Sequence, residues 1–129
     1  MLTAGQFEES EALVLLVEFK ADLNAYLAQR GPTTPVQSLA EIIEFNERHA
    51  EQTMPFFGQD LLHRAQAQGP LTGHTYQQAL AINQQMARDE GIDATLRTHR
   101  LDAIVAATCT LAWLTDPING DHYQGSCTS

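Results

Sequence analysis

The sequence has little basic charge and few cysteines, and each shortage excludes a class of function. It carries 7 lysine and arginine residues against 16 aspartate and glutamate residues, which gives a formal net charge of −9. The basic residues are scattered singly, so no basic face is available to a phosphate backbone, and we expect no nucleic-acid partner. The two cysteines, Cys109 and Cys127, form no C-x-x-C motif, which argues against a zinc site or a redox motif.

The chain also lacks a long apolar run. The longest uncharged stretch of membrane type, Ala12 to Val17, is far too short to cross a bilayer, so we expect no membrane partner. The N-terminal residues MLTAGQFEES are acidic and do not resemble a secretory signal. We interpret the two cysteines as free thiols of a reducing compartment. These features together predict a soluble, cytoplasmic protein.

What the sequence does contain is enough apolar material for one core. Its 129 residues are 43% hydrophobic, which predicts a single domain over residues 1–129. Helical spacing of apolar residues predicts a first helix from Phe7 to Gln29, with Ser10 as its N-cap and Gly31 after its end. The expected apolar stripe of this helix consists of Leu13, Leu16, Phe19, Leu23, Tyr26 and Leu27.

Capping and breaker residues mark the later helices. Ser38 and Glu41 form a capping box, in which each side chain satisfies a free backbone N–H group at the start of a helix. Gly91 interrupts the longest helical pattern and predicts either a kink or two abutting helices. The further helices are predicted from Ser38 to about Glu51, from Gln59 to about Gln68 and from Thr72 to about Arg100.

One short stretch is typical of a strand. Leu101 to Ala107 is apolar throughout, the pattern of a strand covered on both faces. Such a strand needs sheet neighbours, because unpaired backbone groups are costly when buried. No second convincing strand occurs in the sequence. We therefore predict a mainly α fold of about four helices plus one short apolar strand, the slice of a larger structure.

Candidate metal-binding and catalytic residues are few. Asp60 and His63 stand at i and i+3, the spacing by which helical bundles present a carboxylate and an imidazole to one metal. No second pair of this kind occurs, and an exposed helical histidine is the favoured interpretation. No G-x-S-x-G motif is present, and Lys20 has no serine nearby in sequence, so we interpret it as a solvated helix lysine. The residues thus predict no catalytic group, no metal and no cofactor.

A pocket is better supported after the predicted strand. The loop there carries Trp113, Asp116 and Asn119, and α/β proteins place ligands in loops at the C-terminal ends of buried strands. These three residues are our substrate-pocket candidates. Anchoring of the loop by the same residues is the alternative, and the sequence favours neither.

Three stretches in the same order resemble the amidase signature family. They are EFKADLNAYL (Glu18 to Leu27), SLAEIIEFNERHAEQTMPFFGQDLL (Ser38 to Leu62) and LDAIVAATCTLAWLTDPINGDHY (Leu101 to Tyr123). The resemblance implies an α/β/α sandwich around a mixed sheet and hydrolysis of carboxamide C–N bonds by a serine, a bridging serine in a cis peptide and a lysine. Those catalytic elements belong upstream of the matching stretches, and Lys20 matches a lysine that is not the catalytic one. The family often has proline and glycine where this chain reads AATCTLAWLTD.

The resemblance sets the expected function. We expect part of an amidase-like domain that is inactive alone, with a small amide as substrate only in the full-length context. Its expected partners are the rest of an amidase chain or another copy of itself as a homo-oligomer. A free-standing helical oligomerisation or interaction module is the first alternative. A metal-binding helical bundle built on Asp60 and His63 is the second.

Overall fold

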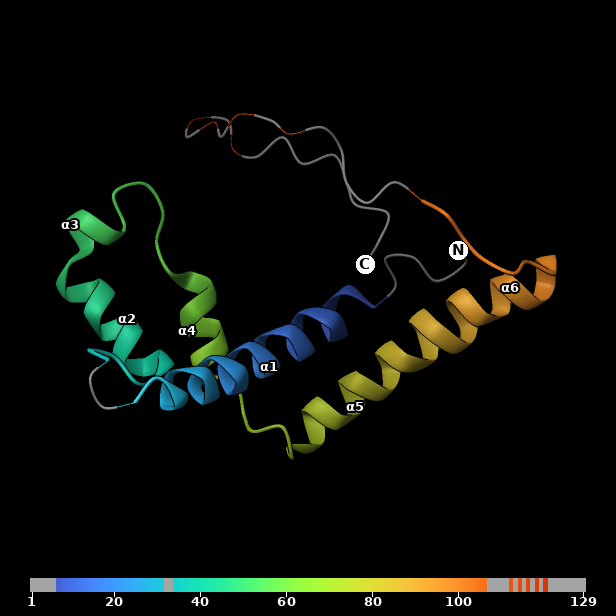
Figure 1. Ribbon diagram of the computed structural model, residues 1–129, viewed down its shortest axis with the longest axis horizontal. Coiled ribbons are helices and arrows are strands. Elements are labelled where there is room, and N and C mark those ends of the chain that lie inside the picture. Colours follow the sequence, from blue (N-terminus) through green and yellow to red (C-terminus); the bar gives the residue numbers. More distant parts are fainter. Residues whose placement is uncertain are drawn as a thin grey trace.

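The computed structural model describes residues 7–31 and 34–106 and, beyond them, residues 112, 114, 116, 118 and 120. The predicted mainly helical fold is confirmed in this part of the chain (Figure 1). Its elements are α1 (Glu8–Gln29), α2 (Leu39–Arg48), α3 (Ala50–Thr53), α4 (Asp60–Gln66), α5 (His74–Asn83), the π-helix η1 (Gln84–Ile92) and α6 (Asp93–His99). No helix of the described residues is both long and apolar enough to span a membrane.

Helix α1 is the longest element, and α2, α4 and α5 pack on it. It begins where the sequence predicts, but Ser10 is not its N-cap: Phe7 occupies that position without a side-chain cap. The Ser10 hydroxyl oxygen lies 2.8 Å from the Phe7 carbonyl oxygen and 2.6 Å from Asn83 Oδ1. We predicted a cap because serine suits the N-cap position. In the structure Ser10 instead contacts α5, and the sequence alone does not show this contact. The helix ends before Gly31, whose positive φ of 79° suits glycine.

The capping box at the start of α2 is present in a modified form. The Ser38 hydroxyl accepts a hydrogen bond from the Glu41 N–H at 3.2 Å, as predicted. The Glu41 carboxylate accepts from the Gln37 N–H at 2.8 Å, one residue before the usual position. A second cap comes from α1, where Asn24 Oδ1 accepts the Leu39 N–H at 2.8 Å. This bond fixes the start of α2 against α1.

The hydrophobic core lies where α1, α2 and α4 meet. Its buried members are Leu16, Leu39, Ile43 and Ala65, with Leu23 and Leu62 packed against them. Gln59 is the buried polar residue of this region; its Nε2 donates to the Ile43 carbonyl at 3.1 Å and its Oε1 accepts from Asn46 Nδ2 at 3.0 Å. The predicted stripe of α1 is confirmed at Leu16 and Leu27, whereas Tyr26 is 55% exposed.

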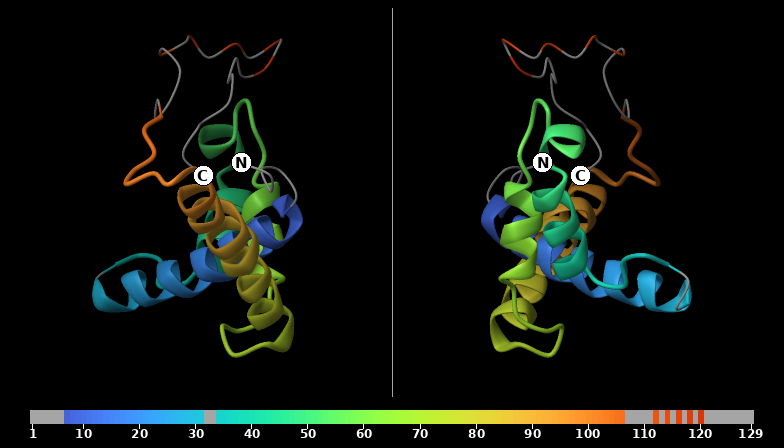
Figure 2. Two further views of the ribbon diagram at one scale, coloured as in Figure 1. Left: turned by 90° about the vertical axis from the view of Figure 1, so that its right-hand side faces the viewer. Right: turned by 90° about the vertical axis from the view of Figure 1, so that its left-hand side faces the viewer.

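The second half of the described chain is one long rod. Helices α5 and α6 are joined without a break through η1, which contains Gly91. The sequence predicts a kink or two abutting helices here, and the structure instead widens the helix into π geometry. Helix α5 packs along α1, whereas α6 contacts no described element other than η1. The rod therefore runs on past the N-terminal end of α1 (Figure 1), and in the views of Figure 2 it crosses α1 at a steep angle.

The predicted strand is not formed over its described residues, 101–106. Arg100 adopts the left-handed conformation with φ 54°, and the Leu101 N–H donates to the Leu96 carbonyl at 2.9 Å. These are features of a Schellman motif that ends α6. The following residues have no strand pairing, and Val105 is 94% exposed. The composition of a strand is present, but the described chain offers no neighbouring strand for its backbone groups.

Candidate functional site

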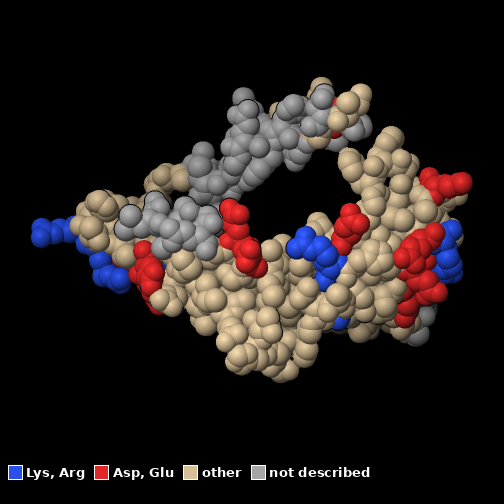
Figure 3. Space-filling model, turned by 180° about the vertical axis from the view of Figure 1, so that it is seen from behind, with Lys and Arg blue, Asp and Glu red and all other residues tan. Residues whose placement is uncertain are grey.

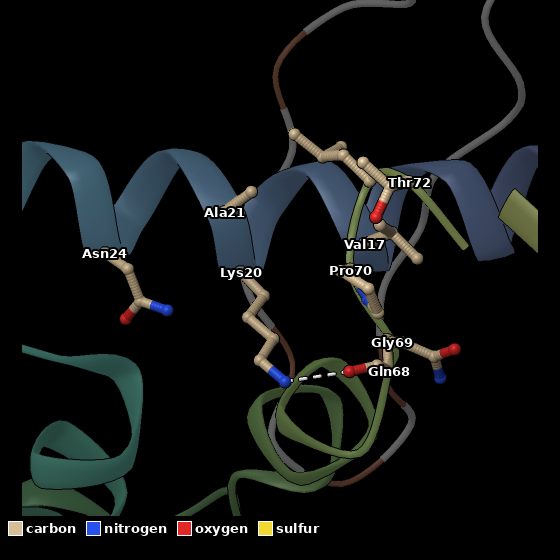
Figure 4. A pocket seen from close by; sticks show the side chains of 9 residues that line it. Val17, Lys20, Ala21, Asn24, Gln68, Gly69, Pro70 and Thr72 are labelled. Atoms are coloured by element: carbon tan, nitrogen blue, oxygen red, sulfur yellow. Dashed lines mark hydrogen bonds between the residues drawn. The ribbon is translucent and has the colours of Figure 1, made fainter.

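A pocket of about 520 Å³ lies between α1 and the loop that joins α4 to α5 (Figure 4). Val17, Lys20, Ala21 and Asn24 line it from α1, and residues 68–72 line it from the loop. The lining contains no carboxylate, imidazole or thiol. It therefore offers apolar surface and hydrogen-bonding groups, and Lys20 is the one ionisable side chain of its lining.

Lys20 is held at the C-terminal end of α4. Its Nζ donates to the carbonyl oxygens of Gln66 and Gln68, each at 2.8 Å. The last carbonyls of a helix lack partners within it and carry partial negative charge, so an ammonium group there is favourable. The expected solvated lysine is thus wrong: Lys20 is partly buried and connects α1 to α4. Figure 4 shows its side chain reaching from α1 to the Gln68 carbonyl.

The spacing of residues along α1 indicates that Lys20 contacts a neighbouring helix, although the composition of the sequence does not. Val17, Lys20, Asn24 and Leu27 are separated by three, four and three residues, so they share one face of α1. Val17 and Leu27 are buried, and Asn24 caps α2. A lysine on that face must therefore meet a neighbouring element. Which carbonyl groups meet it depends on where α4 ends, which the spacing in α1 does not give.

A second polar contact holds α5 against α1. The Tyr76 hydroxyl donates to Glu18 Oε1 at 2.7 Å. This hydrogen bond is the main reason that the pKa of Tyr76 is raised above its ordinary value of 10.0; burial and the charges of Glu18 and Asp22 act in the same direction. A tyrosine that is harder to deprotonate acts here as a hydrogen-bond donor. The pair thus joins two helices and shows no sign of a catalytic base.

The predicted pocket residues are described only in part. The Asp116 carboxylate accepts a hydrogen bond from the Ile118 N–H at 2.9 Å, and the Asp116 carbonyl accepts from the Gly120 N–H at 2.9 Å. These bonds, with a φ of 85° at Gly120, make a tight turn. Asp116 thus has hydrogen-bond partners two and four residues further along the chain. Trp113 and Asn119 lie outside the described residues.

Asp60 and His63, the residues of the metal-binding alternative, gain no further ligand in the described part of the chain. His63 Nε2 lies 3.5 Å from Glu47 Oε1, and both side chains are about half exposed. Over residues 7–31 and 34–106 and the few described beyond them, no group of three or more histidine, cysteine, aspartate or glutamate residues has the arrangement that a metal needs. The structure therefore supplies no support for that alternative.

Comparisons with known proteins indicate where this arrangement comes from. No family model matches the sequence. A probable amidase of Arabidopsis thaliana is 37% identical over 102 residues, which are 78% of this chain and 19% of that protein. The crystal structure of the peptide amidase PAM with the competitive inhibitor chymostatin matches with a TM-score of 0.84 at 40% identity. The native peptide amidase of Stenotrophomonas maltophilia matches with a TM-score of 0.76 at 42% identity.

The chain is homologous to a segment of the amidase signature peptide amidases. The resemblance drawn from its three stretches is thereby confirmed. The match with the inhibitor complex covers 95% of this chain and 24% of the amidase chain. The chain therefore spans about a fifth of the curated relative and about a quarter of the solved one.

Proposed function

We propose that this chain forms the helical part of an amidase signature hydrolase and is inactive without the remainder of such an enzyme. In that setting the reaction is hydrolysis of a carboxamide C–N bond, and peptide amides are the expected substrates because two of the relatives are peptide amidases. Within it, α1, α2 and α4 act as a scaffold. The reacting groups come from the polypeptide that this chain does not match.

The proposal rests on two features of the match with the peptide amidase: the two structures are closely alike, and the match covers only part of the amidase chain. A TM-score of 0.84 at 40% identity over 95% of the chain supports a common structure. The same match leaves 76% of the amidase chain without a counterpart, since 24% is covered. In the family that this chain resembles, the two catalytic serines and the catalytic lysine are expected in that unmatched part.

The chemistry of this chain's own residues agrees with a scaffold role. Lys20, the one lysine of the sequence, has two of its three N–H groups engaged by the carbonyls of Gln66 and Gln68. Ser10 contacts Asn83, and Ser38 caps α2. These side chains already have structural partners, and none of these contacts pairs a serine with a lysine as nucleophilic catalysis by this family requires.

Two activity measurements test the proposal. The purified 129-residue chain, assayed on simple amides and on C-terminally amidated peptides, is expected to give no turnover sensitive to phenylmethylsulfonyl fluoride. A chimera of the Stenotrophomonas maltophilia peptide amidase, with its matched segment replaced by this chain, is expected to hydrolyse the same substrates and to lose activity with the inhibitor. Inhibitor-sensitive turnover by the chain alone, or a chimera without activity, contradicts the proposal.

A second candidate function is a free-standing oligomerisation module. The observation that favours it is the number of large apolar side chains left exposed, among them Phe56, Phe57, Leu61 and Val105. A second copy of the chain is one way to cover such surface. Light scattering over a range of concentrations tests it, because a well-folded monomer at high concentration excludes the module.

A further inference from the structure

Two hydrogen-bond donors line the pocket between α1 and the loop from α4 to α5 without a full set of acceptors in the described chain. The Lys20 ammonium group has three N–H groups but two acceptors, the carbonyl oxygens of Gln66 and Gln68. The Asn24 amide oxygen accepts the Leu39 N–H at 2.8 Å, whereas the amide nitrogen has no acceptor among the described residues. Both side chains are partly buried. The pocket therefore presents donors for a group that the described chain does not supply.

The two donors lie on one side of α1. Lys20 and Asn24 stand four positions apart, so the helix brings them to the same face, and Figure 4 shows both side chains projecting from α1 in the same direction. The Leu39 N–H fixes the orientation of the Asn24 amide, because the atom that accepts this bond must be the oxygen. The amide nitrogen is thus the free end of the group, and in Figure 4 it lies on the side nearer to Lys20.

The charge of Lys20 has no counter-ion in the part of the chain that the structure describes. The ion pairs there join His63 to Glu47 and Arg88 to Asp93, and the lining of the pocket contains no carboxylate. The carbonyl groups at the end of α4 carry only partial negative charge. A ligand with a full negative charge would therefore strengthen the pairing of the ammonium group.

The rest of the lining determines which anion fits. Val17, Ala21, Pro70 and Leu71 provide apolar walls, and apolar walls with a few placed polar groups are typical of small-molecule sites. The volume of about 520 Å³ is in the range of such sites. The formal net charge of −9 disfavours an anion of double charge. The pocket thus suits a singly charged anion with an apolar body.

We propose that this pocket binds a small monocarboxylate. The carboxylate lies between Lys20 Nζ and Asn24 Nδ2, and each of its oxygens accepts a hydrogen bond from one of the two free donors. The apolar body lies against Val17, Ala21 and Leu71. All of these groups belong to the described residues, so the isolated chain contains the whole site. The site is therefore independent of the proposed function.

Three probes with the same phenylpropyl body test the chemistry: phenylpropanoate, the neutral phenylpropanamide and the cationic phenylpropylamine. In NMR titrations of the isotope-labelled full chain, the acid is expected to give saturable shifts of the Asn24 side-chain amide and the Gly69 backbone amide. A Kd in the millimolar range is expected for so small a probe. The amide and the amine are expected to bind at least ~10-fold more weakly, because neither offers a charge that pairs with Lys20. No saturation by the acid, or no preference for it over both other probes, overturns the proposal.

Two substitutions that add the same charge separate the site from a general effect of net charge. Asn24→Asp keeps an oxygen for the Leu39 N–H but replaces the free nitrogen by a second oxygen, and is expected to weaken phenylpropanoate binding at least ~10-fold. Asn83→Asp likewise keeps the oxygen that contacts the Ser10 hydroxyl. Ser10 precedes Lys20 by about 15 Å along α1, beyond the screening length of about 8 Å at physiological salt, so a change below ~2-fold is expected. Equal losses in the two variants contradict the site.

A further pair of variants tests the apolar wall. Ala21→Leu enlarges a side chain of the lining and keeps a good helix former, so it is expected to weaken phenylpropanoate binding at least ~5-fold by filling the pocket. Ala25→Leu makes the same change at an exposed position of α1 outside the lining and is expected to leave the affinity unchanged. Circular dichroism checks that both variants keep their helices. Full affinity in Ala21→Leu would show that the apolar body does not lie in this pocket.

Discussion

Two regions of the molecule differ in how far their apolar and polar groups find partners. The first is the junction of α1, α2 and α4. The second is the distal arm, by which we mean η1, α6 and the segment 101–106. The junction buries Leu39 completely and pairs both ends of the Gln59 amide. The arm buries only Gly91 within its helices, and α6 contacts nothing but η1 among the described elements. The junction has a hydrophobic core of its own, whereas the distal arm exposes apolar side chains without forming a core.

The two regions differ in which described elements pack against them. The junction is formed by contacts among α1, α2 and α4, all of which lie within this chain. The arm exposes apolar side chains such as Ile92, Ile104 and Val105, and α6 contacts no described element other than η1.

The largest expected effect comes from opening the core of the junction. Leu39→Ala removes a side chain that is 0% exposed, and the lost burial and the cavity are expected to lower the free energy of unfolding by about 2–5 kcal/mol. In the arm, Ile92→Ala changes a side chain that is 44% exposed and is expected to cost less than about 1 kcal/mol. Chemical denaturation followed by circular dichroism measures both, and similar losses would erase the contrast between the regions.

The next effect concerns buried polar groups. Gln59→Ala leaves the Ile43 carbonyl and the Asn46 amide without their partner, and is expected to cost about 1–3 kcal/mol in the free energy of unfolding. The matched change in the arm is Gln85→Ala, which removes an exposed hydrogen bond to Glu90, and is expected to fall within about 0.5 kcal/mol of zero. Denaturant titration of the two variants compares them, and a larger loss for Gln85→Ala contradicts the distinction.

A smaller effect of opposite sign is expected at the two helix ends. Arg100 ends α6 with a φ of 54°, a conformation that Gly31 adopts after α1 with a φ of 79°. Because the left-handed region costs a residue with a Cβ about 1 kcal/mol, Arg100→Gly is expected to stabilise the end of α6 and Gly31→Ala to destabilise that of α1. Amide exchange at the ends of α6 and α1 reports each change. Faster exchange in α6 with Arg100→Gly would show that the left-handed conformation carries no strain there.

The smallest effect is expected from pH at the contact between α5 and α1. The folded protein holds the Tyr76 proton more tightly than the unfolded chain, since the bond to Glu18 raises the pKa of Tyr76. Its contribution to stability is therefore complete below the unfolded value of 10.0 and is lost as pH rises through the higher folded value. Unfolding measured between pH 8 and about 11 is expected to show a steeper fall for the natural chain than for Tyr76→Phe. Parallel curves would mean that this tyrosine does not stabilise the attachment of the rod.

Parts of the fold are predictable because their causes are local. The start of α2 follows from Ser38 and Glu41, and the length of α1 follows from its apolar spacing and from Gly31. The widened helix around Gly91 was predictable as an interruption but not as a π segment, because its geometry depends on how the hydrogen bonds of the whole rod are arranged. The residues of the site were harder to predict from the sequence, because Lys20 and Asn24 form hydrogen bonds with groups of other elements.

The sequence was enough to predict where most of the helices lie, that Ser38 caps α2 and that the chain is related to amidases, because each depends on residues near one another in the chain or on a pattern that relatives share. Only the tertiary structure decided that Lys20 binds the end of α4, that Ser10 reaches α5 instead of capping α1, and that the segment 101–106 has composition suited to a strand without forming one. The physical reason is that a hydrogen bond needs both partners. The sequence identifies a side chain that can form a hydrogen bond, and the fold decides whether a second group lies within reach of it.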